Sequence, residues 1–351
     1  MSKKRHNLVT LGITRSTLLL VELLTIALCA GCGSSSSGQG ASTNGSPPSG
    51  STSSIQVSQF ADQPKVLAAV KSATSLTSMP SSAVTQLQSL AVGSETGHNF
   101  LPHCQVPSTF ESTVNVASCT FGDRTSSTTM VLVGDSRAEM WFNPIETIAT
   151  AEHIKLVLLA KAGCPSAQAS FRLNNNGALS EAPWPACTAW QNFVSSTIAK
   201  LAPKIVVVAD SVDLDLTTEP GAASPSTAQS DFASFFKSLP SGAKIVLLGG
   251  FPSPASTGAT PTICLSKSPA SIQSCSFPQS PQETQRNNAL ALAAEGAGGA
   301  VIDVSQWLCA SVCPPVIAGN VVYTPDGYHL NHYYVQYLTG VLWAALKPYL
   351  S

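Results

Sequence analysis

The chain has 351 residues, a formal net charge of −1 and 44% hydrophobic residues, but only 11% charged residues, against about 25% in an average soluble domain. This balance excludes a basic nucleic-acid-binding protein, because there is no charge excess to neutralise phosphates. It also excludes a charged disordered chain and a coiled coil, which need far more Glu, Lys and Arg. The ten cysteines favour an oxidising compartment over the cytosol.

The first 31 residues have the pattern of an export signal. Four Lys and Arg residues precede an apolar run over residues 18–30, which is shorter than the about 20 residues of a transmembrane helix. Small residues before Cys32 resemble a bacterial lipobox, although Cys29 stands where Leu is usual and Glu22 interrupts the run. We expect residues 1–31 to be a lipoprotein signal peptide and Cys32 to carry the lipid. Plain secretion and an uncleaved anchor are the alternatives.

Residues 32–54 form the next segment and are almost entirely Ser, Gly, Thr, Pro and Asn after the cysteine, without a charge. Such a segment cannot bury a core and is typical of a flexible tether. Without residues 1–31 the chain keeps 14 basic and 18 acidic residues, a net charge of −4. We therefore expect an exported domain, anchored by lipid to the outer face of the cell membrane or held in the cell envelope, with no nucleic-acid partner.

Eight cysteines remain in the rest of the chain: Cys104, Cys119, Cys164, Cys187, Cys264, Cys275, Cys309 and Cys313. Eight cysteines allow 105 pairings, but their order suggests four short loops that join consecutive cysteines: Cys104–Cys119, Cys164–Cys187, Cys264–Cys275 and Cys309–Cys313. The even count and the exported context favour disulfides. A zinc site is the alternative, but no pair of C-x-x-C motifs is present, so we predict no metal site.

The folded part divides into a lead-in and a strand–helix region. Residues 55–125 predict two short helices and a cysteine loop, and residues 126–351 alternate strands with helices. The predicted strands are continuous runs of Val, Ile and Leu at 130–133, 155–159, 205–208, 244–248 and 300–304. The predicted helices are 138–150, 190–202, 226–238, 281–295 and 332–348. This alternation indicates a three-layer α/β/α domain whose parallel sheet is buried on both faces, with ligands at the carboxyl ends of its strands.

The first predicted strand runs directly into Gly134, Asp135 and Ser136, and a helix follows. Gly134 permits the tight turn, and backbone N–H groups at a helix start can stabilise a developing oxyanion. Ser136 is therefore a candidate nucleophile. On position alone, a helix cap beside the turn residue Asp135 is an equally good interpretation.

Asp326 and His329 lie three residues apart before the last predicted helix. This spacing lets a turn bring the carboxylate to one imidazole nitrogen, while the other nitrogen acts as a base for a serine hydroxyl. The alternative is a helix cap beside a solvated histidine. His332 is the close competitor, which we expect on a face or in the first turn of the final helix.

These blocks resemble the SGNH hydrolase superfamily, also called GDSL-like esterases. Residues 134–136 match its nucleophile block, and Asp326 with His329 match its late Asp-x-x-His block. The similarity is sharper to the periplasmic SGNH domain that is fused to family 3 membrane acyltransferases, which O-acetylate cell-envelope polysaccharides. It covers about residues 60–350, where further short motifs share that branch's order and spacing: 119–123, 161–165, 264–265 with 275–278, Asp303 on the fifth strand before Cys309 and Cys313, and 326–330. The resemblance implies a flavodoxin-like fold.

The resemblance also implies a role for each matched residue. Ser136 would be the nucleophile, His329 the general base and Asp326 the carboxylate that orients it. The oxyanion donors would be the Ser136 backbone N–H and a glycine after the second strand, for which Gly163 is the candidate. No cofactor is implied.

Two departures from the family pattern affect the oxyanion site. The branch often has His after the serine, where this chain has Arg137, and the superfamily has an Asn after the third strand, where this chain has none. Asp210 is a poor substitute because an ionised carboxylate cannot donate, whereas the Ser211 hydroxyl or Arg137 could supply the donor. Losing one donor costs a hydrolase about 100–1000-fold in turnover.

Two further groups of residues are candidates for ligand binding. Asp210, Asp213 and Asp215 are closely spaced as in a cation site, but the loop lacks the glycine and closing Glu of an EF-hand, so we expect a solvated loop. Most of the five tryptophans are expected to pack in the core. Trp184, in a proline-rich stretch, is the expected surface exception that could stack on a sugar.

The sequence thus predicts an exported, lipid-anchored serine esterase or O-acyl transfer domain. Its substrate would be an acylated, most simply O-acetylated, carbohydrate of the cell envelope. Transfer would need a membrane acyltransferase partner, because the multi-helix membrane part is not in this sequence. The alternative is a catalytically weak or inactive carbohydrate-binding SGNH module, which the missing Asn favours.

Overall fold

The computed structural model describes residues 60–91, 104–106, 111–175, 178–212 and 223–350, which belong to one compact unit, Ser53–Ser351. The predicted signal peptide, Cys32 and the tether lie outside the described residues, as do Asp213 and Asp215. Over the described ranges, no helix is both long and apolar enough to cross a membrane.

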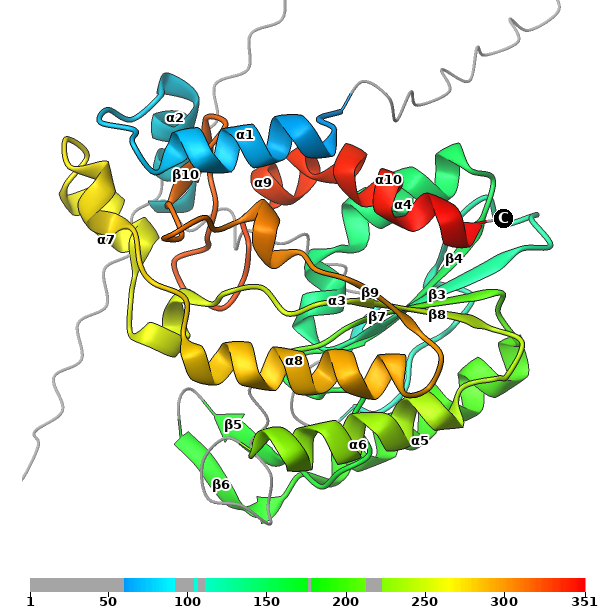
Figure 1. Ribbon diagram of the computed structural model, residues 1–351. Helices are drawn as coiled ribbons and strands as arrows, with labels where there is room; N and C mark the ends of the chain where they lie inside the picture. The colour runs from blue at the N-terminus through cyan, green and yellow to red at the C-terminus, as the bar shows by residue number, and fades with distance from the viewer. Residues whose placement is uncertain (1–59, 92–103, 107–110, 176–177, 213–222, 351) are drawn as a thin grey trace, which may run out of the picture. The chain divides into compact units, whose positions relative to one another are not determined.

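A seven-stranded sheet forms the middle layer of this unit (Figure 1). Its parallel strands lie in the order β4 (Lys155–Lys161), β3 (Thr129–Gly134), β7 (Ile205–Ala209), β8 (Lys244–Leu248) and β9 (Ala300–Ile302). Counted along the chain this is the order 2-1-3-4-5 of the flavodoxin-like folds, which confirms the predicted fold class. The short strands β1 (Gln105–Val106) and β2 (Thr120–Gly122) both pair with β4, β1 in parallel and β2 in antiparallel.

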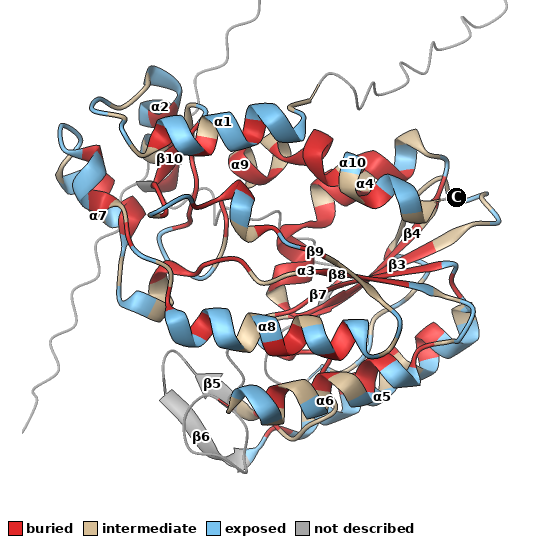
Figure 2. Cartoon of the chain, viewed as in Figure 1, coloured by how far each residue is buried: buried red, intermediate tan, exposed pale blue. Residues whose placement is uncertain are grey.

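Helices cover both faces of the sheet (Figure 1). One face packs against α3 (Ser136–Met140), α4 (Phe142–Ala151), α9 (His332–Tyr337) and α10 (Thr339–Leu350), with α1 (Gln63–Ala73) in the same core. The other packs against α5 (Pro185–Leu201), α6 (Pro225–Ser238) and α8 (Pro281–Glu295). Because successive strand residues point to opposite faces, Met130 and Leu132 enter the first core and Val131 and Val133 the second. The two-sided burial, seen as the red sheet in Figure 2, explains the uninterrupted apolar runs.

The remaining elements are short and lie at the ends of this sandwich. They are α2 (Ser81–Ala91), α7 (Pro261–Lys267), the hairpins β5 (Arg172–Asn175)–β6 (Ala178–Pro183) and β10 (Val316–Ile317)–β11 (Asn320–Val321), and the 3-10 helices η2 (Pro254–Thr257), η3 (Ile272–Cys275) and η4 (Ser305–Trp307).

The predicted lead-in is part of the same unit as the sheet. It contains the two expected helices, α1 and α2, and also supplies β1 and β2 to the edge of β4. The Gln86 side chain of α2 joins the lead-in to the β10–β11 hairpin: its amide nitrogen donates to Asn320 Oδ1 at 2.9 Å, and its Oε1 accepts from the Val321 N–H at 2.8 Å.

Four disulfides join the pairs that chain order suggests: Cys104–Cys119, Cys164–Cys187, Cys264–Cys275 and Cys309–Cys313. The zinc alternative is therefore wrong for these cysteines, because each sulfur is bonded to another. Every pair closes a local loop of the chain, and each of the two cores contains paired cysteines.

Several element boundaries differ from those predicted, each for a local reason. The predicted helix 138–150 is two helices that meet at Trp141, because Pro144 has no N–H for the carbonyl four residues before it. Helix α5 begins at Pro185 rather than at residue 190, since proline fits the first turn of a helix. Strand β9 ends at Ile302, so Asp303 lies in a turn, where its Oδ1 accepts from the Ser305 N–H at 2.9 Å. The final helix is interrupted at Leu338.

The expectation of an exposed Trp184 is wrong. Trp184 is only 4% exposed, because it directly precedes α5 and its ring faces the Lys161 ammonium at 4.9 Å. Lys161 is itself fully buried at the end of β4, where its Nζ donates to the Glu111 carbonyl oxygen at 2.8 Å. The buried Lys161 ammonium thus lies between the Trp184 ring and the Glu111 carbonyl oxygen. This interaction explains the burial of a tryptophan whose proline-rich surroundings predicted an exposed position.

Gly134 offers a test of how closely β3 approaches β7. Its φ is +155°, and a Cβ on it would lie 1.9 Å from the Ala209 carbonyl oxygen. We expect Gly134→Ala to lower the free energy of unfolding by about 1–3 kcal/mol or more in a denaturant titration. Gly242→Ala is the control, since no atom lies within 4 Å of its added Cβ and a change within about 0.5 kcal/mol is expected. Equal losses in both variants would contradict the close approach.

Lys161 makes stability depend on pH in the alkaline range. Burial lowers the pKa of Lys161 from 10.5 to about 8, against the opposing attraction of Glu111. Between these values the unfolded chain binds the proton that the folded chain has lost, so folding becomes more favourable as pH rises. Denaturant titrations from below pH 8 to above 10.5 should show wild type gaining stability relative to Lys161→Met. A difference between the two proteins that is constant or falls with pH would contradict this.

Candidate active site

Ser136 lies where β3 turns into α3. Strand β3 is buried up to Gly134, and Asp135 then caps the helix, its Oδ1 accepting from the Arg137 N–H at 2.8 Å. This cap leaves Ser136 as the first helical residue, at the carboxyl edge of the sheet. The site lies beside the β3–β7 boundary, where the strand order reverses direction and where α/β sheets form their ligand crevices.

Asp326 and His329 lie in a tight turn between Tyr323 and Leu330, which form an isolated β-bridge. Asp326 Oδ1 accepts from the Thr324 hydroxyl at 2.5 Å and from the Tyr328 N–H at 2.7 Å. Gly327 has a φ of +73°, the left-handed conformation that glycine adopts without strain. The turn therefore holds the Asp326 carboxylate through Oδ1, and Oδ2 remains for the contact with the His329 imidazole.

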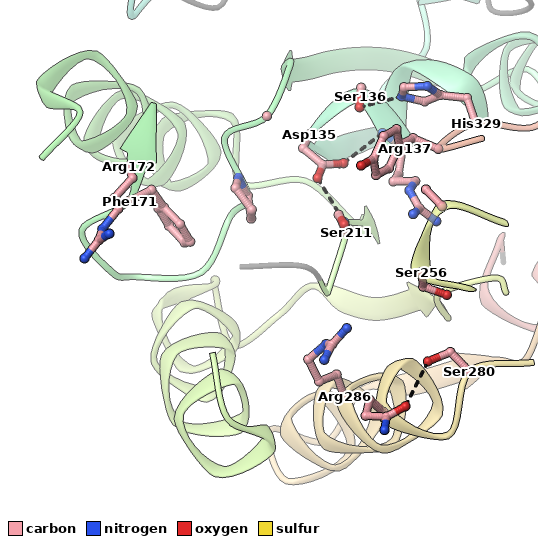
Figure 3. A pocket seen from close by; sticks show the side chains of 15 residues that line it. Asp135, Ser136, Arg137, Phe171, Arg172, Ser211, Ser256, Ser280, Arg286 and His329 are labelled. Carbon is pink, nitrogen blue, oxygen red and sulfur yellow. Dashed lines mark hydrogen bonds between the residues drawn. The ribbon is translucent and has the colours of Figure 1, made fainter. Parts of the chain in front are cut away.

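The structure brings Ser136, His329 and Asp326 into one hydrogen-bonded line (Figure 3). His329 Nδ1 is 2.9 Å from Asp326 Oδ2, and His329 Nε2 is 2.8 Å from Ser136 Oγ. Since a carboxylate only accepts, Nδ1 carries the proton and Nε2 is left to accept from the Ser136 hydroxyl. The competitor His332 begins α9, and its ring contacts the Tyr333 ring with centroids 3.8 Å apart and a tilt of 39°.

The Asp326 carboxylate remains ionised over the whole range in which a histidine base works. Burial alone would raise the pKa of Asp326, but the hydrogen bond from His329 and those from Thr324 and the Tyr328 N–H outweigh it and hold the pKa below its usual range. A charged carboxylate on Nδ1 stabilises the imidazolium that forms when Nε2 takes a proton.

A second layer of hydrogen bonds holds the histidine turn against η2 and α8. The Gly327 carbonyl oxygen accepts from Ser253 Oγ at 2.9 Å and from the Ala255 N–H at 3.2 Å. The buried Glu283 of α8 in turn accepts from the Ser253 N–H and from Ser256 Oγ, each at 2.9 Å. The position of His329 therefore depends on the loop after β8 as well as on its own turn.

Asp210 is buried, so the expectation of a solvated loop is wrong at this position. It is 2% exposed, and its carboxylate accepts from the Asp135 N–H at 2.9 Å and from the Ser166 N–H at 3.2 Å. Burial and the neighbouring Asp135 together raise the pKa of Asp210 well above its usual value. Because its oxygens are directed to these loops, Asp210 serves as a link between the ends of β3, β4 and β7.

Asp135 is the second member of this buried pair. Its Oδ2 accepts from the Ser211 N–H at 3.0 Å, and burial raises the pKa of Asp135 against the opposing charge of Arg137. Ser211, directly after Asp210, faces the cavity beside Ser136. Ser211 is therefore the residue just after the third strand that lines the cavity, in the region where the family pattern has an Asn.

The cavity above Ser136 has a volume of about 610 Å³, which suits a small ligand. Gly163 lines it beyond the end of β4, with a φ of +68°. Arg137 lines it as well, but its guanidinium lies 3.9 Å from the centre of the Phe251 ring, beyond the end of β8. In the described part of the chain, no three His, Cys, Asp or Glu residues are grouped so that they could hold a metal ion.

Sequence reasoning missed several residues of this cavity. Arg286 of α8 and Ser256 of η2 both line it, and Glu283 supports it from behind. None of them stands in a recognisable motif, and each reaches the site only through the packing of α8 and η2 beside the sheet. The Pro281 helix start was readable in the sequence, but the face that α8 presents to the cavity was not.

Three comparisons relate this chain to known proteins. The family model of the SGNH domain, described as fused to AT3 domains, matches residues 103–344. No curated protein matches the chain.

Two solved structures are similar to this chain at low sequence identity. The periplasmic domain of a lipopolysaccharide acetyltransferase from Salmonella ser. Paratyphi A is 12% identical, with a TM-score of 0.52 over 70% of this chain and 92% of that one. A Bacteroides fragilis protein classed as an acylhydrolase is 14% identical, with a TM-score of 0.40 over 67% and 93% of the two chains.

The first of these structures supports the fold, and the family model covers more than half of the chain. The chain belongs to the SGNH domain family, in the branch described as fused to AT3 domains.

Proposed function

We propose that this protein is a serine esterase or O-acyl transfer domain that acts on acylated, most simply O-acetylated, carbohydrate of the cell envelope. The observation that carries the proposal is the hydrogen-bonded line from Ser136 Oγ to His329 Nε2 and from His329 Nδ1 to Asp326 Oδ2, at 2.8 and 2.9 Å. A nucleophile, a base and an orienting carboxylate at such distances can form and break an acyl-enzyme.

The first half-reaction transfers the acyl group to Ser136. Ser136 Oγ attacks the ester carbonyl carbon while His329 Nε2 takes the hydroxyl proton, and the ionised Asp326 stabilises the imidazolium. When the tetrahedral intermediate collapses, the bond to the sugar oxygen breaks. His329 returns the proton to that oxygen, so that the free sugar hydroxyl leaves and an ester on Ser136 remains.

The oxyanion needs fixed donors on the side of Ser136 that faces β4 and β7. We assign the backbone N–H groups of Ser136 and Gly163 to it, with the Ser211 hydroxyl as a third donor, because all three residues line the same cavity. Arg137 adds positive charge from the β8 side, where Phe251 holds its guanidinium. A hydroxyl in place of the family's Asn makes a slow hydrolase the expectation.

The second half-reaction decides between hydrolase and transferase. His329 Nε2 can take a proton from water or from a second sugar hydroxyl, whose oxygen then attacks the Ser136 ester. Water regenerates the enzyme as a hydrolase, and a sugar hydroxyl moves the acyl group to a new glycan. Membership of a family described as fused to AT3 domains supports a membrane acyltransferase as the acyl donor for the transfer.

We also propose an export route and an anchor for the domain. The four disulfides suit an oxidising compartment, and the similar solved structure is a periplasmic domain. Residues 1–31 would be the signal peptide, Cys32 the lipid-carrying residue, 32–54 the tether, 55–125 the lead-in and 126–351 the catalytic part.

Removal of the proposed nucleophile should abolish turnover. The purified full chain is offered a chromogenic acetyl ester, alongside Ser136→Ala and Asp326→Asn. Asp326→Asn should lower kcat by up to about 10⁴-fold, because the imidazole loses its orientation and its tautomer. Ser234→Ala, on the exposed face of α6, is the control and should match wild type.

Other outcomes separate the alternatives. Hydrolysis that survives in Ser136→Ala would overturn the catalytic assignment. Acetyl transfer that appears only with an added sugar acceptor would favour the transferase. Glycan binding without any turnover would favour a carbohydrate-binding module.

The proposed lipid anchor can be tested by replacing one residue. In a bacterial host grown with a labelled fatty acid, wild type should incorporate label and sediment with membranes, because a diacyl-modified Cys32 holds the chain there. Cys32→Ser should lose both properties, whereas Cys29→Ser should keep them. Label in the Cys32→Ser chain would contradict the assignment.

A further inference from the structure

The starting point is a buried positive charge beside Ser136. Arg137 is only 5% exposed, and its guanidinium lies 3.9 Å from the centre of the Phe251 ring. Over the described part of the chain, no hydrogen bond or ion pair of this guanidinium is found within 4.0 Å. The Asp135 carboxylate acts on it only from a greater distance, since its two oxygens accept the N–H groups of Arg137 and Ser211.

This guanidinium is open to the cavity. Arg137 lines the cavity, and in the described residues none of its side-chain nitrogens is among the fully buried atoms that lack a hydrogen-bond partner. A guanidinium presents five N–H donors in a fixed plane, which an anion in the cavity can accept. The side chain cannot easily turn away, because Arg137 is held in α3 by the Asp135 cap and its guanidinium is stacked on Phe251. The arrangement therefore keeps a ready anion-binding group in the free protein.

A second arginine enters the same cavity from the other side. Arg286 projects from α8 toward the space that Arg137 faces (Figure 3). Arg172 lies farther off, beside Phe171. Of the described residues that line the cavity, three are arginines and one, Asp135, is a carboxylate. This local excess of positive charge contrasts with the net charge of −1 on the whole chain.

Two serines that line the cavity near the arginines, Ser256 and Ser280, are engaged in hydrogen bonds within the chain. Ser256 Oγ donates to Ser253 O at 2.7 Å or to Glu283 Oε2 at 2.9 Å. Ser280 Oγ accepts from the Glu283 N–H at 3.3 Å as the cap of α8. The guanidinium of Arg137 is consequently the strongest donor that the cavity offers to a ligand.

The Arg137 guanidinium lies on the opposite side of the cavity from Gly163, one of the proposed oxyanion donors. Gly163 follows β4, whereas the Phe251 ring that holds the guanidinium follows β8, and β3 and β7 lie between these strands. Three strand spacings amount to about 14 Å, the scale of a sugar unit with its substituents rather than of one carbonyl oxygen.

We propose that Arg137 and Arg286 together bind an anionic group of the substrate, a carboxylate or a phosphate carried by the acylated sugar or by the unit next to it. This inference rests on the proposed function, since it takes the acyl ester to lie at Ser136. The proposed substrate class is thereby narrowed from acylated glycans in general to acidic acylated glycans. Bidentate contacts from a guanidinium suit both anions.

The test compares three acetyl esters of one pyranoside that differ only at C6, which is a hydroxymethyl group, a carboxylate or a phosphorylated hydroxymethyl group. The full chain should hydrolyse one anionic ester with a kcat/KM at least about 10-fold above the neutral one, mainly through a lower KM, and salt should reduce this preference. The ester with the higher kcat/KM shows whether the substrate's anionic group is a carboxylate or a phosphate. Arg286→Gln and Arg137→Gln should each reduce this preference by about 10-fold, or until the anionic and neutral esters are hydrolysed with equal kcat/KM.

Lys204→Gln is the matched control, because it removes the same charge from an exposed residue at the opposite end of β7. It should leave the preference at the wild-type value. Equal kcat/KM values for all three esters would overturn the inference and leave the proposed esterase intact. A fall in kcat in Arg137→Gln that is equal for neutral and anionic esters would also overturn it, and would assign Arg137 to the oxyanion.

Binding provides a readout that does not need turnover. Calorimetry on Ser136→Ala, with the three uncleaved esters, should show tighter binding of an anionic ester and loss of that difference in the Ser136→Ala/Arg286→Gln double variant. If no ester is hydrolysed by wild type, the proposed esterase fails, and this measurement still decides on the anion site. Equal binding of all three esters would then overturn it.

Discussion

The site depends on a pair of buried aspartates. Asp210 accepts the N–H groups of Asp135 and Ser166, and Asp135 accepts those of Arg137 and Ser211. These bonds join the loops after β3, β4 and β7, which carry the proposed nucleophile and the proposed oxyanion donors. Two carboxyl groups so close and so buried cannot both be charged without cost, which is why the pKa of Asp210 lies far above its usual value. The backbone hydrogen bonds to this aspartate pair thus hold Ser136 in place.

A feature of the fold or the site could be predicted from the sequence when neighbouring residues determine it, and could not when residues distant in the chain do. Helix α8 was predicted to the residue because Ser280 and Pro281 are local start signals. The Ser136, Asp326 and His329 blocks were readable for the same reason, since each is a short turn motif. Trp184 and Asp210 were misjudged because their burial comes from distant partners, Lys161 and the β3 loop. Arg286 carried no signal, because only the packing of α8 brings it to the cavity.

The proposed chemistry and the proposed specificity use different parts of one sheet edge. In this proposal the ends of β3, β4 and β7 would surround the acyl group, and the loop after β8 with α8 would surround the remainder of the substrate. The loop after β8 also holds the histidine turn, through Ser253 and Gly327. A ligand that contacts η2 would therefore also affect the position of His329, through the hydrogen bonds to the Gly327 carbonyl oxygen.

The disulfide pattern bears on how such a chain matures. Consecutive cysteines pair throughout, with separations of 15, 23, 11 and 4 residues. A chain that crosses a membrane amino-terminus first presents its thiols in this same sequence, so an oxidant that joins each newly arrived cysteine to the previous one produces the native set without later reshuffling. None of the four bonds needs the parallel sheet to be assembled beforehand. Oxidation can accordingly run ahead of the slow, long-range pairing of β3, β4 and β7.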